Sequence, residues 1–155
     1  MSHSDTLPGI STDPPRSTAQ RKSDVLALLE EERHVWVSTA GPDGPHLVPL
    51  AYIWDGTWLV MATQSKNRTV RNLLHSPRAR LALGAATDVV LLDGEIEIVE
   101  PGDAQARDLG AGLPLDPARG AGRVWLVFIP SRIMTWRHRG EIAGRTVMAD
   151  SQWLA

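Results

Sequence analysis

VSTAGPDGPHLVPLAYIWDGTWLVMAT, residues 37–63, is the stretch of sequence that decides the fold. Its apolar runs are interrupted by the turn sequences GPDG at residues 41–44 and DG at residues 55–56. Runs rich in β-branched and aromatic residues favour extended backbone, and short Gly-, Pro- and Asp-containing connections between them are typical of β-hairpins. Together with the residues from His34 onward, the stretch predicts three antiparallel strands joined by two hairpins.

Further strand patterns follow toward the C-terminus. Residues 79–86, 89–100, 123–138 and 141–149 each predict a strand, the last two across a turn at Arg139-Gly140. Asp93-Gly94 is compatible with a hairpin turn or with a bulge inside one long strand, and we favour one strand because VVLL alone is short. Six to seven antiparallel strands fit a closed or partly closed split β-barrel, which removes the exposed edges of an open sheet.

Short helices are predicted between the strands. Ser23 is a candidate N-cap for an amphipathic helix, and Thr69 can cap a second helix whose Val70, Leu73 and Leu74 face inward. This second helix should end before Pro77. Residues 101–122 predict a brief helix and a Gly/Pro-rich loop. Residues 1–20 are rich in Ser, Thr, Pro and Asp and predict a flexible arm, so the folded domain should span residues 21–155.

The amino-acid composition limits the classes of protein to which this chain can belong. A chain of 155 residues that is 43% hydrophobic suits one globular domain, and no apolar run is long enough to cross a bilayer. We therefore expect a soluble, cytoplasmic protein without a membrane partner. Cysteine is absent, and the histidines show no metal-ligand spacing, so no metal site is predicted. The net charge of -2 argues against a protein that coats nucleic acid.

Positive charge is nevertheless concentrated in two windows that lack acidic residues. The first lies between Asp55 and Asp88, and the second spans residues 117–140. The first contains Lys66, Arg68, Arg71, Arg78 and Arg80; the second contains Arg119, Arg123, Arg132, Arg137 and Arg139. A helix start offers unpaired N–H groups to a phosphate, and a hydroxyl of Ser65 or Thr69 and the Arg68 guanidinium would complete its shell. The alternative is a solvated helix whose arginines pair with the acidic residues 30–32.

The order of these segments resembles the pyridoxamine 5'-phosphate oxidase-like split β-barrels that bind FMN or the deazaflavin coenzyme (F-420). The resemblance rests on residues 37–63, on SKNRTVRNLLHSPRARLAL at 65–83 and on DVVLLDGEIEIVE at 88–100. In the vitamin-oxidising members the second helix starts with Ser-Arg-Lys, and the aligned residues here are Asn67, Arg68 and Thr69. The arginine is present, and a threonine replaces the lysine, whose charge Lys66 or Arg71 would have to supply.

The resemblance implies a homodimer with two cofactor sites at its interface. The cofactor ring would lie against the backbone of the second strand, with amides near Val48 and Leu50 as donors and Pro49 unable to donate. The phosphate would be held by residues 63–72. The cofactor-binding residues implied on one subunit are Val48, Pro49, Leu50, Thr63, Ser65, Lys66, Asn67, Arg68, Thr69 and Arg71. Trp136 and Arg137 are interpreted as reaching the partner's cofactor.

These expectations lead to two functional hypotheses. The first is an oxidoreductase that uses FMN or the deazaflavin to transfer a hydride to a small unsaturated or quinone-like molecule. No acid–base pair stands out, so catalytic residues are not assigned. Vitamin B6 oxidation is not expected, because the substrate-binding C-terminal region of those oxidases has no convincing copy here. The second hypothesis is a non-catalytic barrel that stores or senses a flavin, haem or related ring.

Overall fold

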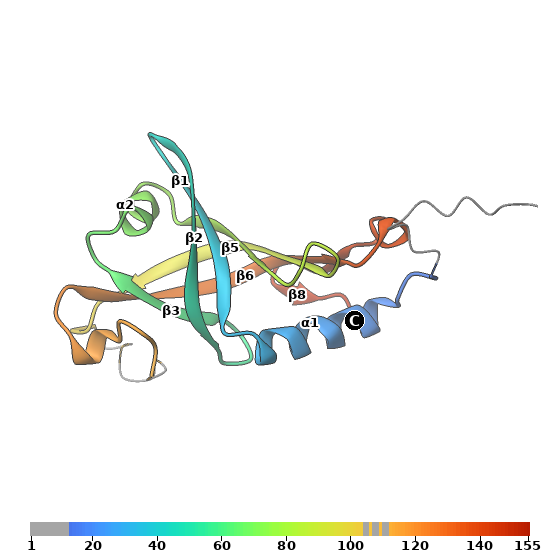
Figure 1. Ribbon diagram of the computed structural model, residues 1–155, viewed down its shortest axis with the longest axis horizontal. Coiled ribbons are helices and arrows are strands. Elements are labelled where there is room, and N and C mark those ends of the chain that lie inside the picture. The colour runs from blue at the N-terminus through green and yellow to red at the C-terminus, as the bar shows by residue number, and fades with distance from the viewer. Residues whose placement is uncertain (1–12, 104–105, 107–108, 110–111) are drawn as a thin grey trace, which may run out of the picture.

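The computed structural model describes residues 13–103, 106, 109 and 112–155. Within these residues the protein is mainly β, with eight strands and two α-helices (Figure 1). The strands are β1 (His34–Gly41), β2 (Gly44–Trp54), β3 (Leu59–Gln64), β4 (Arg78–Leu83), β5 (Val89–Val99), β6 (Arg123–Trp136), β7 (Thr146–Ala149) and β8 (Gln152–Trp153). The two predicted hairpins are confirmed as β1–β2 and β2–β3.

Six of the strands close into an antiparallel barrel. The sheet order is β3-β2-β1-β4-β5-β6-β7-β8, and a further pairing of β3 with β6 completes the ring. The predicted barrel class is therefore confirmed. β7 falls in the strand predicted at residues 141–149, and it extends the edge of β6. The strand number exceeds the predicted six to seven because the two-residue β8, which was not predicted, pairs with β7 in a small hairpin.

Alternating side chains fill the barrel. Val35, Val37, Leu81, Leu92 and Phe128 point inward and are almost wholly buried. A second apolar cluster lies around Trp125 and Val127 of β6, whose side chains point to the other face of the strand from Phe128. The barrel wall between β3, β5 and β6 is thus packed on both faces, whereas β1 and β4 leave their outward residues partly exposed.

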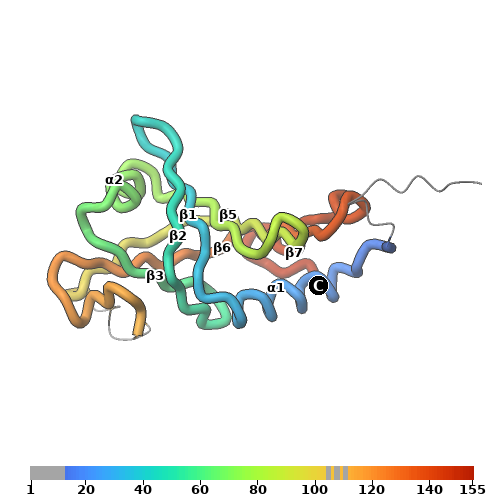
Figure 2. The backbone as a smooth tube through the Cα atoms, in the orientation of Figure 1, coloured from blue at the N-terminus to red at the C-terminus, as the bar shows by residue number. Residues whose placement is uncertain are grey.

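The first helix, α1 (Thr18–Glu31), lies beside β6 and β7 (Figure 2). The predicted start at Ser23 was wrong, because Ser17 caps the helix by accepting a hydrogen bond from the Gln20 N–H. Val25 and Leu29 pack into the core. Of the arm expected at residues 1–20, residues 1–12 lie outside the described residues, whereas residues 18–20 belong to α1.

The long strand β5 contains the bulge suggested at Asp93-Gly94, so the single-strand interpretation is confirmed. The register shifts there, with Asp93 opposite Arg132 and Gly94 opposite Pro130. A Cβ atom at Gly94 would lie 2.1 Å from the Ile129 carbonyl oxygen and 2.9 Å from the Phe128 ring. Only glycine allows this close approach of β6.

The second helix, α2 (Arg68–His75), ends at Ser76 before Pro77, as predicted. Val70 and Leu73 are buried, but the expectation that Leu74 faces inward was wrong, since Leu74 is 75% exposed. Residues 112–122 contain the 3-10 helix η2 (Pro117–Arg119), and the predicted Arg139-Gly140 turn is the 3-10 helix η3 (Arg139–Glu141). Among the described residues, no helix has the length and apolar character needed to span a bilayer.

Candidate functional site

The turn between β3 and α2 is held at both ends by hydrogen bonds. Thr63, the penultimate residue of β3, is buried, and its hydroxyl accepts a hydrogen bond of 2.7 Å from the Asn67 side-chain amide. The Ser65 N–H donates to the Gly122 carbonyl at 2.9 Å. The backbone of the predicted phosphate loop is therefore anchored to β3 and to the residue just before β6.

Asn67 occupies the N-cap of α2 but does not cap it. An N-cap asparagine usually accepts a hydrogen bond from the first turn of its helix. Here the side-chain amide donates to Thr63 instead, and the side chain makes no cap hydrogen bond. The first-turn N–H groups of α2 are therefore unpaired donors at the positive end of the helix dipole, and both features favour an anion.

The basic residues of this turn have no carboxylate partner among the described residues. Lys66 and Arg71 are exposed and Arg68 is half-buried. The ion pairs of the described residues involve none of these three cations, and none joins them to residues 30–32 as the solvated-helix alternative expects. Thr69, which replaces the family's lysine, is buried. The charge at this turn therefore comes from Lys66, Arg68 and Arg71.

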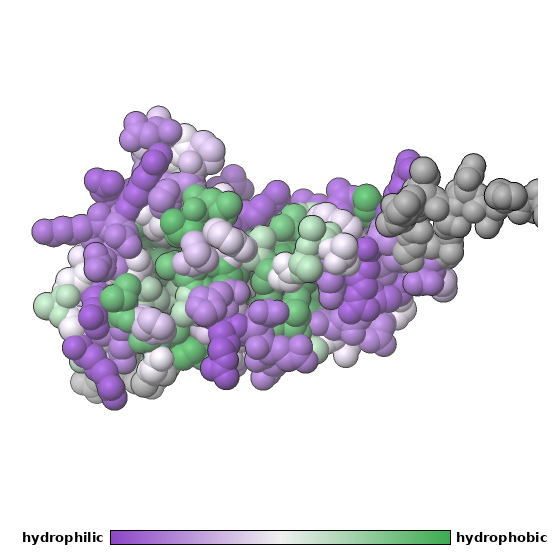
Figure 3. Space-filling model, viewed as in Figure 1, coloured by the Kyte–Doolittle hydropathy of each residue, from purple (hydrophilic) through white to green (hydrophobic). Residues whose placement is uncertain are grey.

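The two acid-free windows of the sequence meet at this turn. Gln64 pairs with Arg123 across the β3–β6 ladder, next to the hydrogen bond between Ser65 and Gly122. The Arg123 guanidinium donates to the Asp116 carbonyl at 3.2 Å. In the space-filling view, hydrophilic residues gather around α2 and the β3–α2 turn (Figure 3). The β3–β6 contact joins residues far apart in the chain, so the sequence pattern did not reveal this meeting.

Among the described residues, most of one edge of β2 is unpaired beside the turn. Residues 44–51 pair with β1 along their whole length, whereas β3 pairs only with Tyr52, Ile53 and Trp54. The Tyr52 N–H donates to the carbonyl of Arg33, the residue just before β1, so Tyr52 directs its backbone groups toward β1. Backbone groups alternate in direction along a strand, so every second residue points the same way. Leu50 and Val48 therefore direct their N–H groups toward β1.

The alternating direction of the backbone groups decides which β2 residues can contact the cofactor ring. Leu47, Pro49 and Ala51 direct their backbone toward the free edge. Pro49 has no N–H group, so it can only accept there through its carbonyl. The donors available on this edge are the N–H groups of Leu47 and Ala51, the neighbours of the predicted Val48 and Leu50.

Trp136 and Arg137 lie far from this turn in the same chain. Arg123 and Trp136 mark opposite ends of β6, and thirteen strand steps correspond to about 40 Å. The Arg137 guanidinium already pairs with Asp88 at 3.2 Å and with Asp24 at 3.5 Å. A single chain therefore brings the β2 and β3–α2 residues into one neighbourhood but leaves Trp136 and Arg137 outside it.

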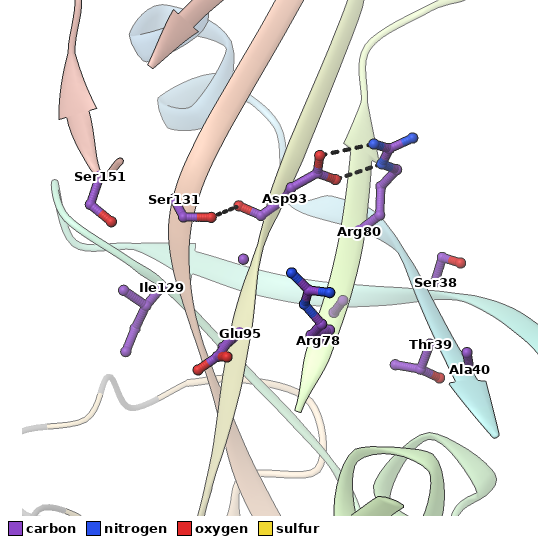
Figure 4. A pocket seen from close by; sticks show the side chains of 12 residues that line it. Ser38, Thr39, Ala40, Arg78, Arg80, Asp93, Glu95, Ile129, Ser131 and Ser151 are labelled. Atoms are coloured by element: carbon purple, nitrogen blue, oxygen red, sulfur yellow. Dashed lines mark hydrogen bonds and ion pairs between the residues drawn. The ribbon is translucent and has the colours of Figure 1, made fainter. Parts of the chain in front are cut away.

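A groove of about 590 Å³ crosses β1, β4, β5 and β6 on the outside of the barrel (Figure 4). None of the twelve predicted site residues lines it. On its wall the Arg80 guanidinium donates to both carboxylate oxygens of Asp93, and this hydrogen bonding holds the pKa of Asp93 below its usual range. Gly94, at the β5 bulge, also lines the groove.

An apolar row runs across the outside of the barrel next to this groove. Trp36 of β1 pairs with Pro49 on one side and with Ala82 on the other. Ala82 pairs in turn with Leu91, and Leu91 with Met134. Trp36 is 50% exposed, which is unusual for a large aromatic side chain on a sheet surface. Figure 3 shows apolar surface over the middle of the barrel, between its hydrophilic ends.

Comparison with known proteins identifies the family. The family model described as pyridoxamine 5'-phosphate oxidase matches residues 22–137. The chain belongs to this family. No curated protein matches the chain. The resemblance inferred for about residues 35–100 is confirmed over a longer stretch, which extends from α1 to the end of β6.

Solved structures with the same fold carry different names. A protein called F420 reductase is 24% identical, with a TM-score of 0.54, covering 69% of this chain and 93% of its own. An FMN-binding protein from Nostoc punctiforme related to pyridoxamine 5'-phosphate oxidase is 14% identical, with a TM-score of 0.55 and 83% of each chain covered. A haem-binding protein from Mycobacterium smegmatis is 19% identical, with a TM-score of 0.63, covering 90% of this chain and 60% of its own.

Proposed function

We propose that this protein is a flavin- or deazaflavin-dependent oxidoreductase that passes a hydride to a small unsaturated or quinone-like organic molecule. The observation that carries the proposal is the β3–α2 turn. Its helix start is uncapped, its three cations lack carboxylate partners among the described residues, and it lies beside a free strand edge. This donor set fits a cofactor with a phosphorylated tail and a flat, hydrogen-bonding ring.

In this proposal the phosphate is held by the first-turn N–H groups of α2, the Ser65 hydroxyl and the Arg68 guanidinium. Lys66 and Arg71 replace the positive charge that is missing at Thr69. Each charge-assisted hydrogen bond stabilises a complex by about 1.5 to 3 kcal/mol, so three or four of them offset the ordering of the ligand. Neither FMN nor the deazaflavin is favoured by these residues alone, because both cofactors carry a phosphate.

The ring is proposed to lie along β2. The Leu47 and Ala51 N–H groups offer donors to its edge, and the Pro49 carbonyl offers an acceptor. When bound, the cofactor supplies the hydride chemistry, and the protein supplies orientation and exclusion of water. The substrate takes the hydride and gains a proton from solvent, which is consistent with the lack of an assigned acid–base pair.

A second copy of the chain is proposed to complete each site. Trp136 and Arg137 are about 40 Å from the turn along β6, so only a partner can bring them to it. The apolar row centred on Trp36 offers a hydrophobic face for such a partner. Arg78 and Glu95 pair across β4 and β5, four residues along each strand from this row, without an ion pair between them. A two-fold related copy would match each with the opposite charge.

A non-catalytic cofactor-binding barrel is the second candidate. It is favoured by the structural likeness to a protein named as haem-binding. The two candidates differ in whether a bound ring is turned over. Single-turnover oxidation of the reduced, protein-bound cofactor by a quinone separates them, because the oxidoreductase proposal requires a faster rate than for the free cofactor. An equal or slower rate would favour the binding role.

Cofactor titration tests the assignment of the turn. FMN and F-420 are titrated separately against the parent protein and against Arg68→Ala, with Arg33→Ala as the matched control. Arg33 is exposed, whereas Arg68 is half-buried, and Arg33 lies outside both acid-free windows. We expect Arg68→Ala to weaken binding of the cofactor that the parent binds by about 1.5 to 3 kcal/mol without loss of folding, and Arg33→Ala to leave it unchanged. Equal affinity in parent and Arg68→Ala would contradict the assignment.

A further inference from the structure

Asn72 is a polar residue in the buried face of α2. Its side chain is 4% exposed, between the apolar Val70 and Leu73 that pack into the barrel. Asparagine is unfavourable in a helix interior, because its helix propensity is low and its buried side-chain amide needs hydrogen-bond partners. Its presence in a helix of only eight residues calls for a specific contact.

That contact is a hydrogen bond to β1. The Asn72 side-chain amide donates to the Thr39 hydroxyl at 3.2 Å, and Thr39 is 3% exposed. Figure 4 shows Thr39 at the end of the outer groove that lies nearest α2. The bond connects the helix that begins at the basic turn with a strand of the barrel wall.

Gly41 makes room for this contact. A Cβ atom at Gly41 would lie 2.1 Å from the Asn72 Oδ1 atom and 2.9 Å from its Cγ atom. Any larger residue would displace the Asn72 side chain or the helix. The sequence therefore combines Thr39, Gly41 and Asn72 to bring α2 close to the end of β1.

A second amide–hydroxyl bond fixes the other end of the same helix. Asn67 donates to Thr63 of β3 at 2.7 Å. Val70 and Leu73 contribute apolar contacts, which are not directional and tolerate sliding of a short helix. The two asparagine–threonine bonds are directional, and they set where the first turn of α2 stands relative to β1 and β3.

We infer that Asn72, through Thr39, is a positioning residue for the phosphate-binding turn. This inference rests on the proposed function, since it assigns the phosphate to the first turn of α2. Asn72 lies one helical turn after Arg68, so a shift of the helix moves the N–H groups and the arginine together. The phosphate shell depends on donors placed within a few tenths of an ångström, whereas the ring contacts on β2 do not depend on α2.

The test compares a phosphorylated ligand with a phosphate-free ligand that carries the same ring. FMN and riboflavin are titrated against the parent, Thr39→Val and Asn72→Leu, with folding checked by circular dichroism. If the parent binds F-420 rather than FMN, F-420 and its phosphate-free deazaflavin ring portion are used. We expect both variants to bind the phosphorylated ligand about tenfold more weakly, a change of about 1.4 kcal/mol, and to bind the phosphate-free ligand within twofold of the parent.

Two further variants separate positioning from general loss of stability. Thr39→Ser keeps the hydroxyl and should retain the preference of the parent for the phosphorylated ligand. Tyr52→Phe removes another buried hydrogen bond, the one from the Tyr52 hydroxyl to the Leu29 carbonyl, and should also retain that preference. Loss of the preference in Tyr52→Phe would overturn the inference, because general destabilisation would then explain the effect.

The remaining outcomes distinguish this inference from the proposed function. A parent that prefers the phosphorylated ligand, with Thr39→Val and Asn72→Leu retaining that preference, overturns the positioning role and leaves the phosphate site intact. A parent that binds both ligands equally overturns the phosphate site itself, and the positioning role with it.

Discussion

Replacing Glu141 by glutamine should destabilise the fold strongly at neutral pH. The Glu141 side chain is wholly buried at the β6–β7 connection. Its carboxylate accepts hydrogen bonds of 2.8 Å from the Arg16 backbone N–H, from the Arg16 Nε and Nη2 atoms and from the Arg137 N–H. The buried Arg21 side chain lies 3.8 Å away. In Glu141→Gln the amide NH₂ group would face these donors, and the arginines would lose their counter-charge.

The size of the effect follows from the pKa of Glu141. Hydrogen bonding from Arg16 lowers the pKa from the usual 4.5 to about 2. A lowering of about 2.5 pH units, at about 1.4 kcal/mol for each, gives about 3 kcal/mol of stability at pH 7. Because the pKa is lower in the folded state, this contribution is present above about pH 4.5 and is lost as the pH falls toward 2.

Urea unfolding followed by tryptophan fluorescence measures the difference. We expect the free energy of unfolding of Glu141→Gln to be about 3 kcal/mol below that of the parent at pH 7, and this gap to shrink to less than half at pH 3. Glu97→Gln is the control, since the Glu97 side chain is exposed, and it should change stability by less than about 0.5 kcal/mol. The reasoning fails if the Glu141→Gln gap is below about 1 kcal/mol at pH 7. It also fails if the gap is the same at both pH values.

Three further substitutions test the barrel and its outer face. Gly94→Ala should lower the free energy of unfolding by more than about 2 kcal/mol in urea titrations, because the new Cβ meets the Ile129 carbonyl at 2.1 Å. If the protein forms the proposed dimer, Trp36→Glu should give a monomer mass in light scattering after size-exclusion chromatography, since it places charge in the apolar row. A dimer mass for Trp36→Glu would show that the interface lies elsewhere. Arg80→Ala should change stability by less than about 1 kcal/mol, because its ion pair with Asp93 is exposed to solvent.

The local pattern of the sequence was sufficient to predict the barrel class. The hairpins at residues 41–44 and 55–56 use short turns, and their strands are neighbours both in the chain and in the sheet. The closure of the barrel by β3 and β6 joins residues 59–64 to residues 123–128, and no local signal encodes that pairing. The start of α1 was misplaced because Glu141, which is distant in sequence, contacts Arg16 just before the Ser17 cap and Arg21 within the helix. These contacts extend the helix beyond the apolar pattern.

Part of the candidate site was likewise predicted from the sequence, and the rest required the structure. The basic turn at Lys66, Arg68 and Arg71 was visible as a charge pattern, and the structure leaves these side chains without carboxylate partners among the described residues. The meeting of this turn with Arg123, the free edge of β2 and the groove at the Gly94 bulge all depend on strand register. Register is set by the packing of the whole barrel, so these features required the three-dimensional structure.

A crystal structure of the protein with its phosphorylated cofactor, FMN or F-420, tests the central claim most directly. The account predicts the phosphate within hydrogen-bond distance of the first-turn N–H groups of α2 and of the Arg68 guanidinium, with the ring along the free edge of β2. A phosphate bound instead by Arg78 in the outer groove, or at any other place away from the β3–α2 turn, would contradict it.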